Sequence, residues 1–135
     1  MDHAATLRQY LHPLARLRGG VPAPPPRFIE PCLATARADA PDGDEWIHEL
    51  EYQGSRTQAH LIDGKPALYT IDGVYCSNTF ASITQALPML SARDAILDGE
   101  VVVLDARGAA DPEALQRDID GSRTDRFVYF VFDLL

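Results

Sequence analysis

Acidic side chains are the groups in this sequence whose types and spacing could do chemistry, and they gather in two short stretches. These acids are Glu49 and Glu51 in HELEYQGSR (48–56), and Asp98, Glu100 and Asp105 in AILDGEVVVLD (95–105). Carboxylate oxygens are ligands for Mg²⁺ and Ca²⁺, so the second stretch raises the hypothesis of a metal site. The alternative, which we adopt, is that Asp98 and Asp105 are structural or solvated, and no metal-binding residue is predicted.

Nucleophilic and metal-binding side chains of other types are scarce. Lys65 is the only lysine and follows Asp63-Gly64, a dipeptide typical of tight turns, which predicts a solvated turn residue. Cys32 and Cys76 stand far apart with no C-x-x-C spacing, so we expect free thiols. No spacing of histidines and cysteines indicates zinc.

The charge of the chain is acidic and uneven. Its 135 residues carry a net charge of −8. Residues 1–37 hold five arginines against two acids, whereas 38–135 hold seven cations against eighteen acids. An acidic body repels phosphate backbones, so the composition disfavours a stand-alone nucleic-acid-binding protein. No apolar run approaches the roughly 20 residues of a membrane-spanning helix, and we expect a cytoplasmic protein.

The elements that must position these side chains follow from the hydrophobic periodicity. Apolar residues at three- and four-residue steps predict a short helix over 4–17, and GGVPAPPP (19–26) is typical of a linker. The same helical spacing predicts helices over 82–90 and 111–119. Period-two alternation or continuous β-branched and aromatic runs predict strands over 46–52, 56–62, 66–71, 95–105 and 126–135.

The last predicted strand, RFVYFVFDLL, is apolar to its final residue. One interpretation is a terminal strand that docks in the centre of the sheet. The other, which we favour, is that the chain stops where a longer fold would continue. An unpaired strand rich in valine, phenylalanine and tyrosine invites association, so it normally lies between neighbours.

Four stretches occur in an order that resembles a known enzyme family. They are FIEPCLAT (28–35), PDGDEWIHELEYQGSR (41–56), AILDGEVVVLD (95–105) and VYFVFDLL (128–135). Over 28–135 the sequence resembles the first half of the adenylation domain of ATP-dependent DNA ligases, particularly the bacterial ligase D type. The resemblance implies an α+β fold, with antiparallel sheets and packed helices, that is part of a ligase-type nucleotidyltransferase (ATP-grasp-like) domain. It divides the chain into a short helix and linker, 1–26, and the adenylation-domain part, 27–135.

The reactive position of that family is altered in this sequence. The resemblance implies a K-x-D-G motif whose lysine attacks the α-phosphate of ATP and forms a lysyl-adenylate, while Mg²⁺ neutralises the triphosphate. Here the motif is E-Y-Q-G, so Glu51 stands where the lysine would be and Gln53 where the aspartate would be. A carboxylate cannot form the phosphoramidate, and it repels the phosphates of the nucleotide. We therefore assign no catalytic residue.

Other positions match the family pattern. By resemblance, Glu49 would lie near the adenine amino group, Arg56 near the phosphates, Glu100 at the ribose, and Phe132 against the base. Ordinary alternatives remain, because Phe132 on an apolar strand suits a protein core and Arg56 suits a salt bridge. A phosphate-facing arginine expected after the third strand is replaced by the sequence at 71–73, Ile-Asp-Gly.

These observations favour a truncated, catalytically inactive homologue of an ATP-dependent DNA ligase, an enzyme class that seals nicks in DNA repair and recombination. The alternative is a pseudoenzyme, a binding module with a residual adenosine pocket or a surface for DNA-repair proteins. The resemblance implies ATP and Mg²⁺ as cofactors, and DNA, an intact ligase or DNA-repair proteins as partners. The net charge of −8 disfavours DNA, and we expect no membrane partner.

Overall fold

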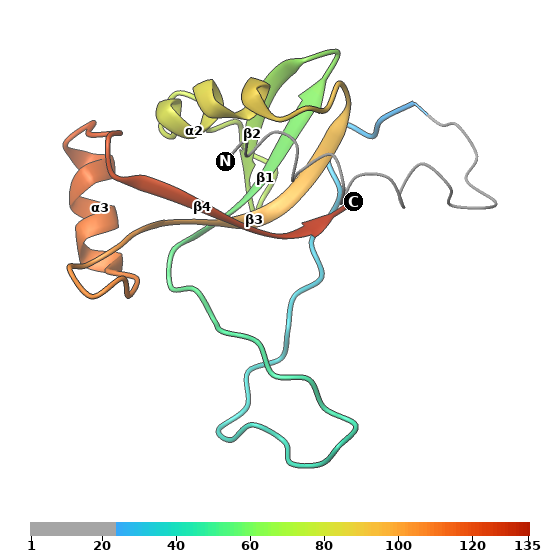
Figure 1. Cartoon of the computed structure of the whole chain (residues 1–135), viewed down its shortest axis with the longest axis vertical. Coiled ribbons are helices and arrows are strands. Elements are labelled where there is room, and N and C mark those ends of the chain that lie inside the picture. The colour runs from blue at the N-terminus through green and yellow to red at the C-terminus, as the bar shows by residue number, and fades with distance from the viewer. Residues whose placement is uncertain (1–23) are drawn as a thin grey trace, which may run out of the picture.

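The computed structural model describes residues 24–135, so the helix predicted over 4–17 lies outside the described part. One sheet of four antiparallel strands, in the order β2-β1-β3-β4, forms the centre of the molecule (Figure 1). The α+β fold class predicted from the sequence is confirmed. In chain order the elements are β1 (Ser55–Ile62), β2 (Lys65–Thr70), α2 (Ala81–Ala86), the short 3-10 helix η2 (Leu87–Met89), β3 (Ala95–Val103), α3 (Pro112–Asp120) and β4 (Phe127–Leu134).

Local sequence explains where several elements begin and end. Asp63 and Gly64 have φ angles of 49° and 72°, the left-handed conformation that a two-residue hairpin turn between β1 and β2 requires. The helix predicted over 82–90 is α-helical only to Ala86, because a proline in η2 removes a backbone donor. At the start of α3, the carboxylate of Asp111 accepts a hydrogen bond from Ala114 N at 2.8 Å and caps the helix.

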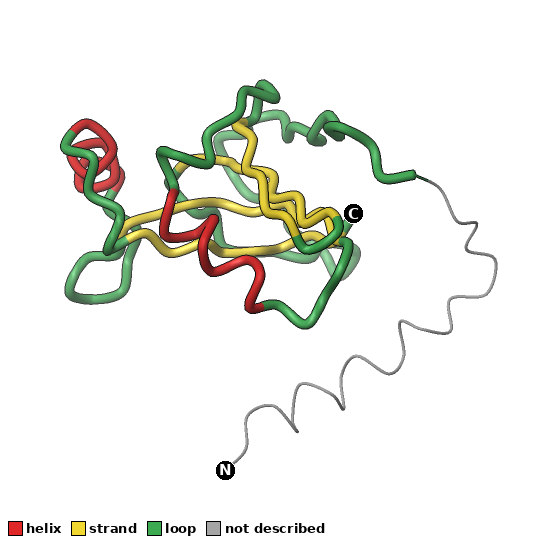
Figure 2. Tube along the Cα trace, turned by 90° about the horizontal axis from the view of Figure 1, so that it is seen from above, coloured by secondary structure: helices red, strands yellow, loops and turns green. Residues whose placement is uncertain are grey.

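One face of the sheet is buried beneath the helices. Alternate strand residues on this face contact α2 and α3, as the two-residue period of a strand requires. Figure 2 shows α2 and α3 over different parts of the strands. The buried apolar cluster consists of Ala59, Leu68, Cys76, Phe80, Ile83, Leu87, Val101, Val103, Ala114, Leu115 and Phe127.

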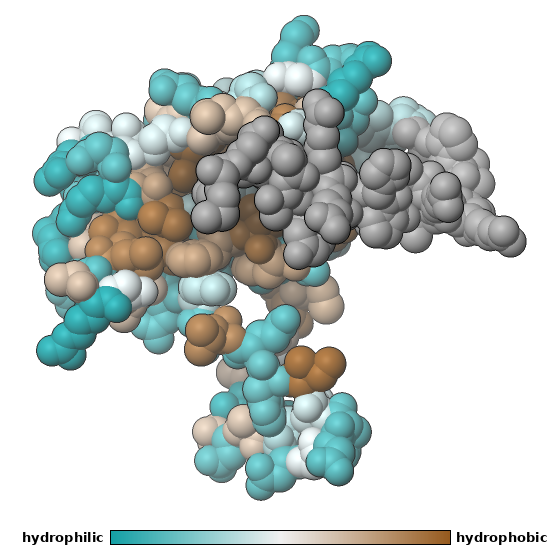
Figure 3. Space-filling view, in the orientation of Figure 1, coloured by the Kyte–Doolittle hydropathy of each residue, from teal (hydrophilic) through white to brown (hydrophobic). Residues whose placement is uncertain are grey.

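The cover over this face is incomplete beside β4. An apolar hollow of about 460 Å³ lies between α2, η2, β3 and β4, and hydrophobic surface is visible in this part of Figure 3. Within residues 24–135 no strand pairs with the outer edge of β4, so the interpretation of this strand as central is wrong. Val131 and Leu134, both on β4, are exposed. None of the helices in the described part is long and apolar enough to cross a membrane.

The strand predicted over 46–52 is also wrong. Residues 31–54 leave the body as a long excursion without helix or strand, seen below the sheet in Figure 1. A turn within it is closed by a hydrogen bond from Trp46 N to Gly43 O at 3.2 Å. The sequence of 46–52 alternates like a strand, but among residues 24–135 no neighbouring strand supplies a ladder of hydrogen bonds.

Candidate functional site

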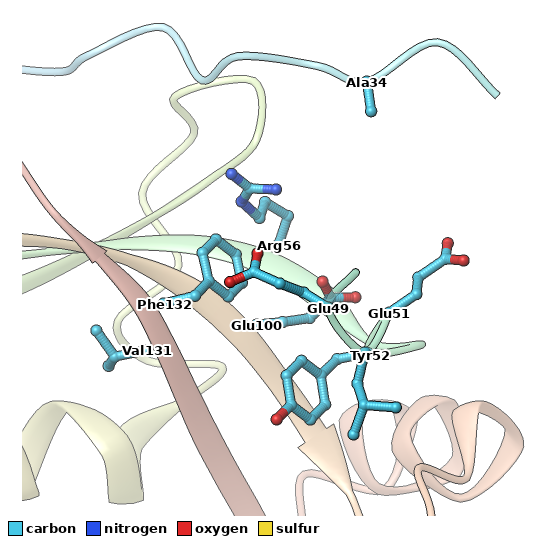
Figure 4. Close-up of a pocket in the computed structure, with 9 residues that line it drawn as sticks. Ala34, Glu49, Glu51, Tyr52, Arg56, Glu100, Val131 and Phe132 are labelled. Atoms are coloured by element: carbon cyan, nitrogen blue, oxygen red, sulfur yellow. The ribbon is translucent and has the colours of Figure 1, made fainter. Parts of the chain in front are cut away.

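A hollow of about 610 Å³ lies where the excursion returns to the sheet (Figure 4). The four residues that the family resemblance assigns to the nucleotide, Glu49, Arg56, Glu100 and Phe132, all line it, and so does Glu51. Ala34, Leu50, Tyr52 and Val131 complete the lining. The structure therefore brings Glu49 and Phe132, which lie 83 positions apart in the sequence, to the same hollow.

The sheet fixes one wall of this hollow. Arg56 on β1 lies directly opposite Glu100 on β3, and Glu100 lies opposite Phe130 on β4. The β3–β4 register then shifts between Asp98 and Gly99, which leaves Phe132 as the extra residue of a β-bulge. A bulge redirects a side chain, and here the ring of Phe132 lies beside Arg56 instead of following the regular alternation.

Glycine is required at the bulge. A Cβ atom added to Gly99 would lie 2.4 Å from the backbone oxygen of Phe130 and 2.7 Å from the ring of Tyr129. Backbone oxygen cannot move away as a flexible side chain can, so a larger residue would displace β4. The Gly in the LDGE stretch therefore holds the strand that carries Phe132 at its present distance from β3.

Arg56 is held by two interactions. Its Nε and a terminal nitrogen donate hydrogen bonds to the two carboxylate oxygens of Asp98, each at 2.8 Å, and its guanidinium carbon lies 4.5 Å from the centre of the Phe132 ring. The hydrogen bonds to Asp98 raise the pKa of Arg56. Asp98 is buried, so its charge is matched by that of Arg56 rather than by water. The salt-bridge alternative raised for Arg56 is the arrangement observed.

Glu100 has a structural contact of its own. Its Oε1 accepts a hydrogen bond from the backbone N–H of Gly54 at 2.7 Å. Gly54 lies so close to β3 that an added Cβ would be 2.3 Å from the backbone oxygen of Val101. Glu100 therefore fastens the end of the E-Y-Q-G motif to the sheet, and the same residue lines the hollow.

The other wall comes from the excursion. The ring of Tyr52 stacks on Phe130 with centroids 4.2 Å apart and planes 11° apart, which places the preceding residues at the rim. Figure 4 shows the side chain of Glu49 reaching toward Phe132 and Arg56, whereas Glu51 points away from them into the open. Glu49 and Glu51 are both exposed.

The electrostatics of the hollow disfavour phosphate. Three carboxylates, those of Glu49, Glu51 and Glu100, line it with one guanidinium, and Asp98 already neutralises that guanidinium. No cluster of histidine, cysteine or acidic residues within 24–135 has the geometry to hold a metal ion. The residues present do not fit a triphosphate with Mg²⁺.

Two other positions named from the sequence lie elsewhere. Lys65 is exposed at the far end of the β1–β2 hairpin, opposite Ile62. Ile62 lies six residue steps from Arg56, which corresponds to roughly 20 Å along β1. Ile71 and Asp72, where the family pattern expects a phosphate-facing arginine, line a different hollow beyond β2.

The sequence interpretation missed the pairing of Arg56 with Asp98. Both residues lie in the stretches that carry the family resemblance, but the sequence alone predicts a structural or solvated role for Asp98. The signal that identifies the pair is the strand register, in which Gln58 lies opposite Asp98 and Arg56 opposite Glu100. The contact is therefore diagonal between neighbouring strands, a geometry that spacing along the sequence does not contain.

Comparison with known proteins identifies a family for this chain. The model of the ATP dependent DNA ligase domain family matches residues 31–135. The multifunctional non-homologous end joining protein LigD of Pseudomonas aeruginosa is 33% identical over 132 residues, which is 98% of this chain and 16% of that protein. The SPbeta prophage-derived DNA ligase-like protein LigB of Bacillus subtilis is 29% identical over 113 residues, 80% of this chain and 39% of that protein.

Solved structures give the same result for the fold. The ligase domain of LigD from M. tuberculosis superposes with a TM-score of 0.58 at 26% identity, over 64% of this chain and 28% of that chain. A mycobacterial DNA ligase D complexed with ATP and MES gives a TM-score of 0.51 at 27% identity, with the same coverage. The chain thus belongs to the ATP-dependent DNA ligase domain family and resembles part of a ligase D adenylation domain. It spans 16% and 39% of the two curated relatives.

Proposed function

We propose that this chain binds the adenosine part of a nucleotide and does not become adenylated. The observation that carries the proposal is the composition of one hollow. Phe132, Glu100, Glu49 and Arg56 surround it as the family pattern implies, while Glu51 occupies the position of the nucleophilic lysine. On this proposal the protein is a ligase-like pseudoenzyme, a binding module that has kept a recognition surface and lost the reacting group.

The lost chemistry concerns the nucleophile. Attack on the α-phosphate needs a nitrogen lone pair, and the resulting phosphoramidate forms when the amine has released its proton. Glu51 offers a carboxylate instead, which repels the phosphate and provides no nitrogen. Lys65, the only amine side chain in the sequence, stands at the other end of β1. DNA sealing requires the adenylate, so we propose no nick-sealing activity for this chain.

The retained chemistry concerns the base and the ribose. Phe132 is 41% exposed, so part of its ring is available to a base, and stacking of a base on an aromatic side chain is worth about 1–3 kcal/mol. Glu49 and the free oxygen of Glu100 can accept hydrogen bonds from an exocyclic amine and a ribose hydroxyl. Arg56 adds little for phosphates because Asp98 holds it by two hydrogen bonds. These terms correspond to millimolar affinity, about −4 kcal/mol.

Titration calorimetry with adenosine and with ATP tests the proposal. We expect both to bind at millimolar concentration, with adenosine at least as tight as ATP, because the triphosphate meets carboxylates. Phe132→Ala should weaken adenosine binding about tenfold, the equivalent of 1.4 kcal/mol. Tyr75→Ala is the matched control, since Tyr75 is an exposed aromatic residue outside the hollow. Absence of adenosine binding, or ATP binding much tighter than adenosine, contradicts the proposal.

A further inference from the structure

Aspartate-glycine pairs give this chain a chemistry that the nucleotide hollow does not use. The sequence contains five of them, Asp42-Gly43, Asp63-Gly64, Asp72-Gly73, Asp98-Gly99 and Asp120-Gly121. In such a pair the backbone nitrogen of the glycine can attack the side-chain carboxyl carbon of the aspartate, because glycine has no Cβ atom to obstruct the approach. The reaction requires that the nitrogen and the carboxyl group are free to turn toward each other.

The glycine nitrogen is already engaged in three of the five pairs, where it donates a hydrogen bond to a backbone oxygen. These bonds run from Gly64 to Arg93 at 2.9 Å, from Gly73 to Thr70 at 2.8 Å and from Gly121 to Arg117 at 2.9 Å. Attack on the aspartate would break the bond and open the turn or helix end that contains it, so the folded state restrains these pairs.

The carboxylate is restrained in the pair at 98–99. Asp98 is 4% exposed and accepts two hydrogen bonds from Arg56, each at 2.8 Å. Gly99 lies within β3, where its backbone is packed against Phe130. Ring closure here would require both the ion pair and the strand pairing to break.

Asp42-Gly43 has none of these restraints from the described part of the chain. Both residues are exposed and lie in the excursion 31–54, which stands away from the sheet in Figure 1. Among residues 24–135, none accepts a hydrogen bond from Gly43 N and none donates one to the Asp42 carboxylate. The turn that follows uses Gly43 O, which accepts from Trp46 N. Backbone outside helices and strands changes conformation with little loss of free energy, so this pair can reach the ring-closing geometry.

We propose that Asp42-Gly43 is a site of spontaneous conversion of aspartate to isoaspartate in the folded protein. A bond forms between Gly43 N and Asp42 Cγ, while the carboxyl hydroxyl and the amide proton leave together as water, which gives a succinimide ring. Water then adds to one of the two ring carbonyls. Opening at Cγ restores aspartate, whereas opening at the backbone carbonyl carbon of Asp42 gives isoaspartate. The two waters balance, so the product has the mass of the original chain.

The product alters the excursion without altering its charge. Isoaspartate keeps one carboxylate, now attached to Cα, and lengthens the backbone by one methylene group. Hydrogen bonds from Gln58 to Ile29 fasten the chain before the excursion, and Tyr52 stacks on Phe130 after it, so the added length is taken up between them. An exposed isoaspartyl carboxylate is the group that protein-repair methyltransferases recognise, and such an enzyme is the kind of partner that the modified chain fits.

The excursion also supplies internal controls. Asp39 and Asp44 are exposed on the same excursion but are followed by Ala40 and Glu45, whose side chains obstruct the attacking nitrogen. We expect these two aspartates to convert much more slowly than Asp42. They separate the effect of glycine from the effect of exposure, and the four restrained pairs separate the effect of the fold.

The test follows isoaspartate in the full chain, kept for several weeks at neutral pH and physiological temperature, either folded or in guanidinium chloride. Trypsin then releases the peptide 38–56; chromatography separates isomers of equal mass, and electron-transfer fragmentation assigns the position. In the folded chain we expect isoaspartate at Asp42 before any other pair, and in the unfolded chain at all five pairs. No conversion of Asp42 in the folded chain, or equal conversion of all five pairs there, would overturn the proposal.

A matched pair of variants tests the assignment by a second readout, methyl transfer from a labelled donor by isoaspartyl methyltransferase. Asp42→Glu keeps the charge and should abolish the labelling of the folded chain, because ring closure would then form a less accessible six-membered ring. Asp72→Glu makes the same exchange in a restrained pair and should keep the original labelling. Equal labelling of the two variants would contradict the assignment. Neither readout involves adenosine, so the result is independent of the proposed nucleotide site.

Discussion

Two neighbouring regions, β1 and the segment 46–52, carry a similar alternating pattern, but only β1 forms a strand. They are separated by two residues in the sequence. β1 lies between β2 and β3, and its Thr57, Ala59 and Leu61 are fully buried. The segment has no strand neighbour among residues 24–135, and its apolar side chains are exposed. An alternating sequence therefore indicates that a segment can form a strand. Whether the strand forms depends on a neighbouring strand to pair with.

The same contrast, between paired strands and the unpaired excursion, separates the two walls of the hollow. Arg56, Glu100 and Phe132 lie on paired strands, where the hydrogen bonds between the strands fix their positions. Glu49 and Glu51 stand on the excursion, where Tyr52 and its stacking partner Phe130 provide the nearest anchor. We therefore expect substitutions in the sheet to change folding stability, and substitutions in the excursion to change binding with little effect on folding.

The largest expected effect is the loss of folding stability when a core residue of the sheet is truncated. Leu68→Ala removes a fully buried side chain from the core and should lower the free energy of unfolding by about 2–5 kcal/mol. Ile47→Ala, in the exposed segment, should change it by less than about 0.5 kcal/mol. Urea unfolding followed by circular dichroism measures both values. Similar losses for the two variants would show that the segment packs against the body in solution.

The next effect concerns the two hydrogen bonds between the Gln58 side chain and the Ile29 backbone, which fasten the start of the excursion to β1. Gln58→Leu removes the hydrogen bonds to Ile29 and His60 and should cost about 1–3 kcal/mol, because the half-buried backbone groups of Ile29 and the buried ring of His60 lose their partner. Urea unfolding measures the loss, and faster amide exchange at Ile29 locates it. The control is Gln116→Leu, since Gln116 makes an exposed contact with Asp120. Equal stability of the two variants would show that the hydrogen bonds between Gln58 and Ile29 do not stabilise the fold.

A smaller effect appears as pH dependence. Gln58 Oε1 already accepts from Ile29 N, so the His60 Nε2 contact at 2.8 Å makes Nε2 the donor. Burial lowers the pKa of His60. The unfolded chain therefore binds the proton more readily, and the stability that His60 contributes is lost as pH falls from about 6.5 toward its lower folded pKa.

Urea unfolding at several pH values measures this contribution. The slope due to one histidine is at most about 1.4 kcal/mol per pH unit. His60→Gln should flatten the dependence in this range, whereas His48→Gln, on the exposed excursion, should keep it. An unchanged slope in His60→Gln would assign the dependence to other groups.

The smallest effect leaves folding unchanged and compares the two thiols. Burial raises the pKa of Cys76 to about 11, so little thiolate is present near neutral pH, whereas Cys32 is exposed on the excursion. Iodoacetamide at pH 8 should modify Cys32 rapidly and Cys76 only after urea unfolds the chain. Peptide mass spectrometry distinguishes the sites. Rapid modification of Cys76 in the folded protein would show that the core opens more readily than its packing implies.

The successes and failures of sequence prediction have the same physical origin. β1, β2, β3 and α3 were predictable because their turns, caps and periodicity are local signals. The absence of a strand at 46–52 and the edge position of β4 depend on which neighbouring strands are present. No local sequence pattern contains this information. Family resemblance alone groups Glu49, Arg56, Glu100 and Phe132, which line the hollow, but it does not indicate Ala34, Leu50, Tyr52 or Val131. The pairing of Arg56 with Asp98 and the bulge at Phe132 were not, since both arise from strand register.

Transfer of AMP to the protein is the measurement that tests the central claim most directly. The claim is that the chain keeps the frame of an adenylation site without its nucleophile, Glu51 standing in place of the lysine. The purified protein is incubated with Mg²⁺ and ATP labelled at the α-phosphate, and then separated by denaturing electrophoresis. We predict no labelled protein band. A labelled band that is lost in Lys65→Ala would contradict the account, because it would show that the remaining lysine serves as the nucleophile.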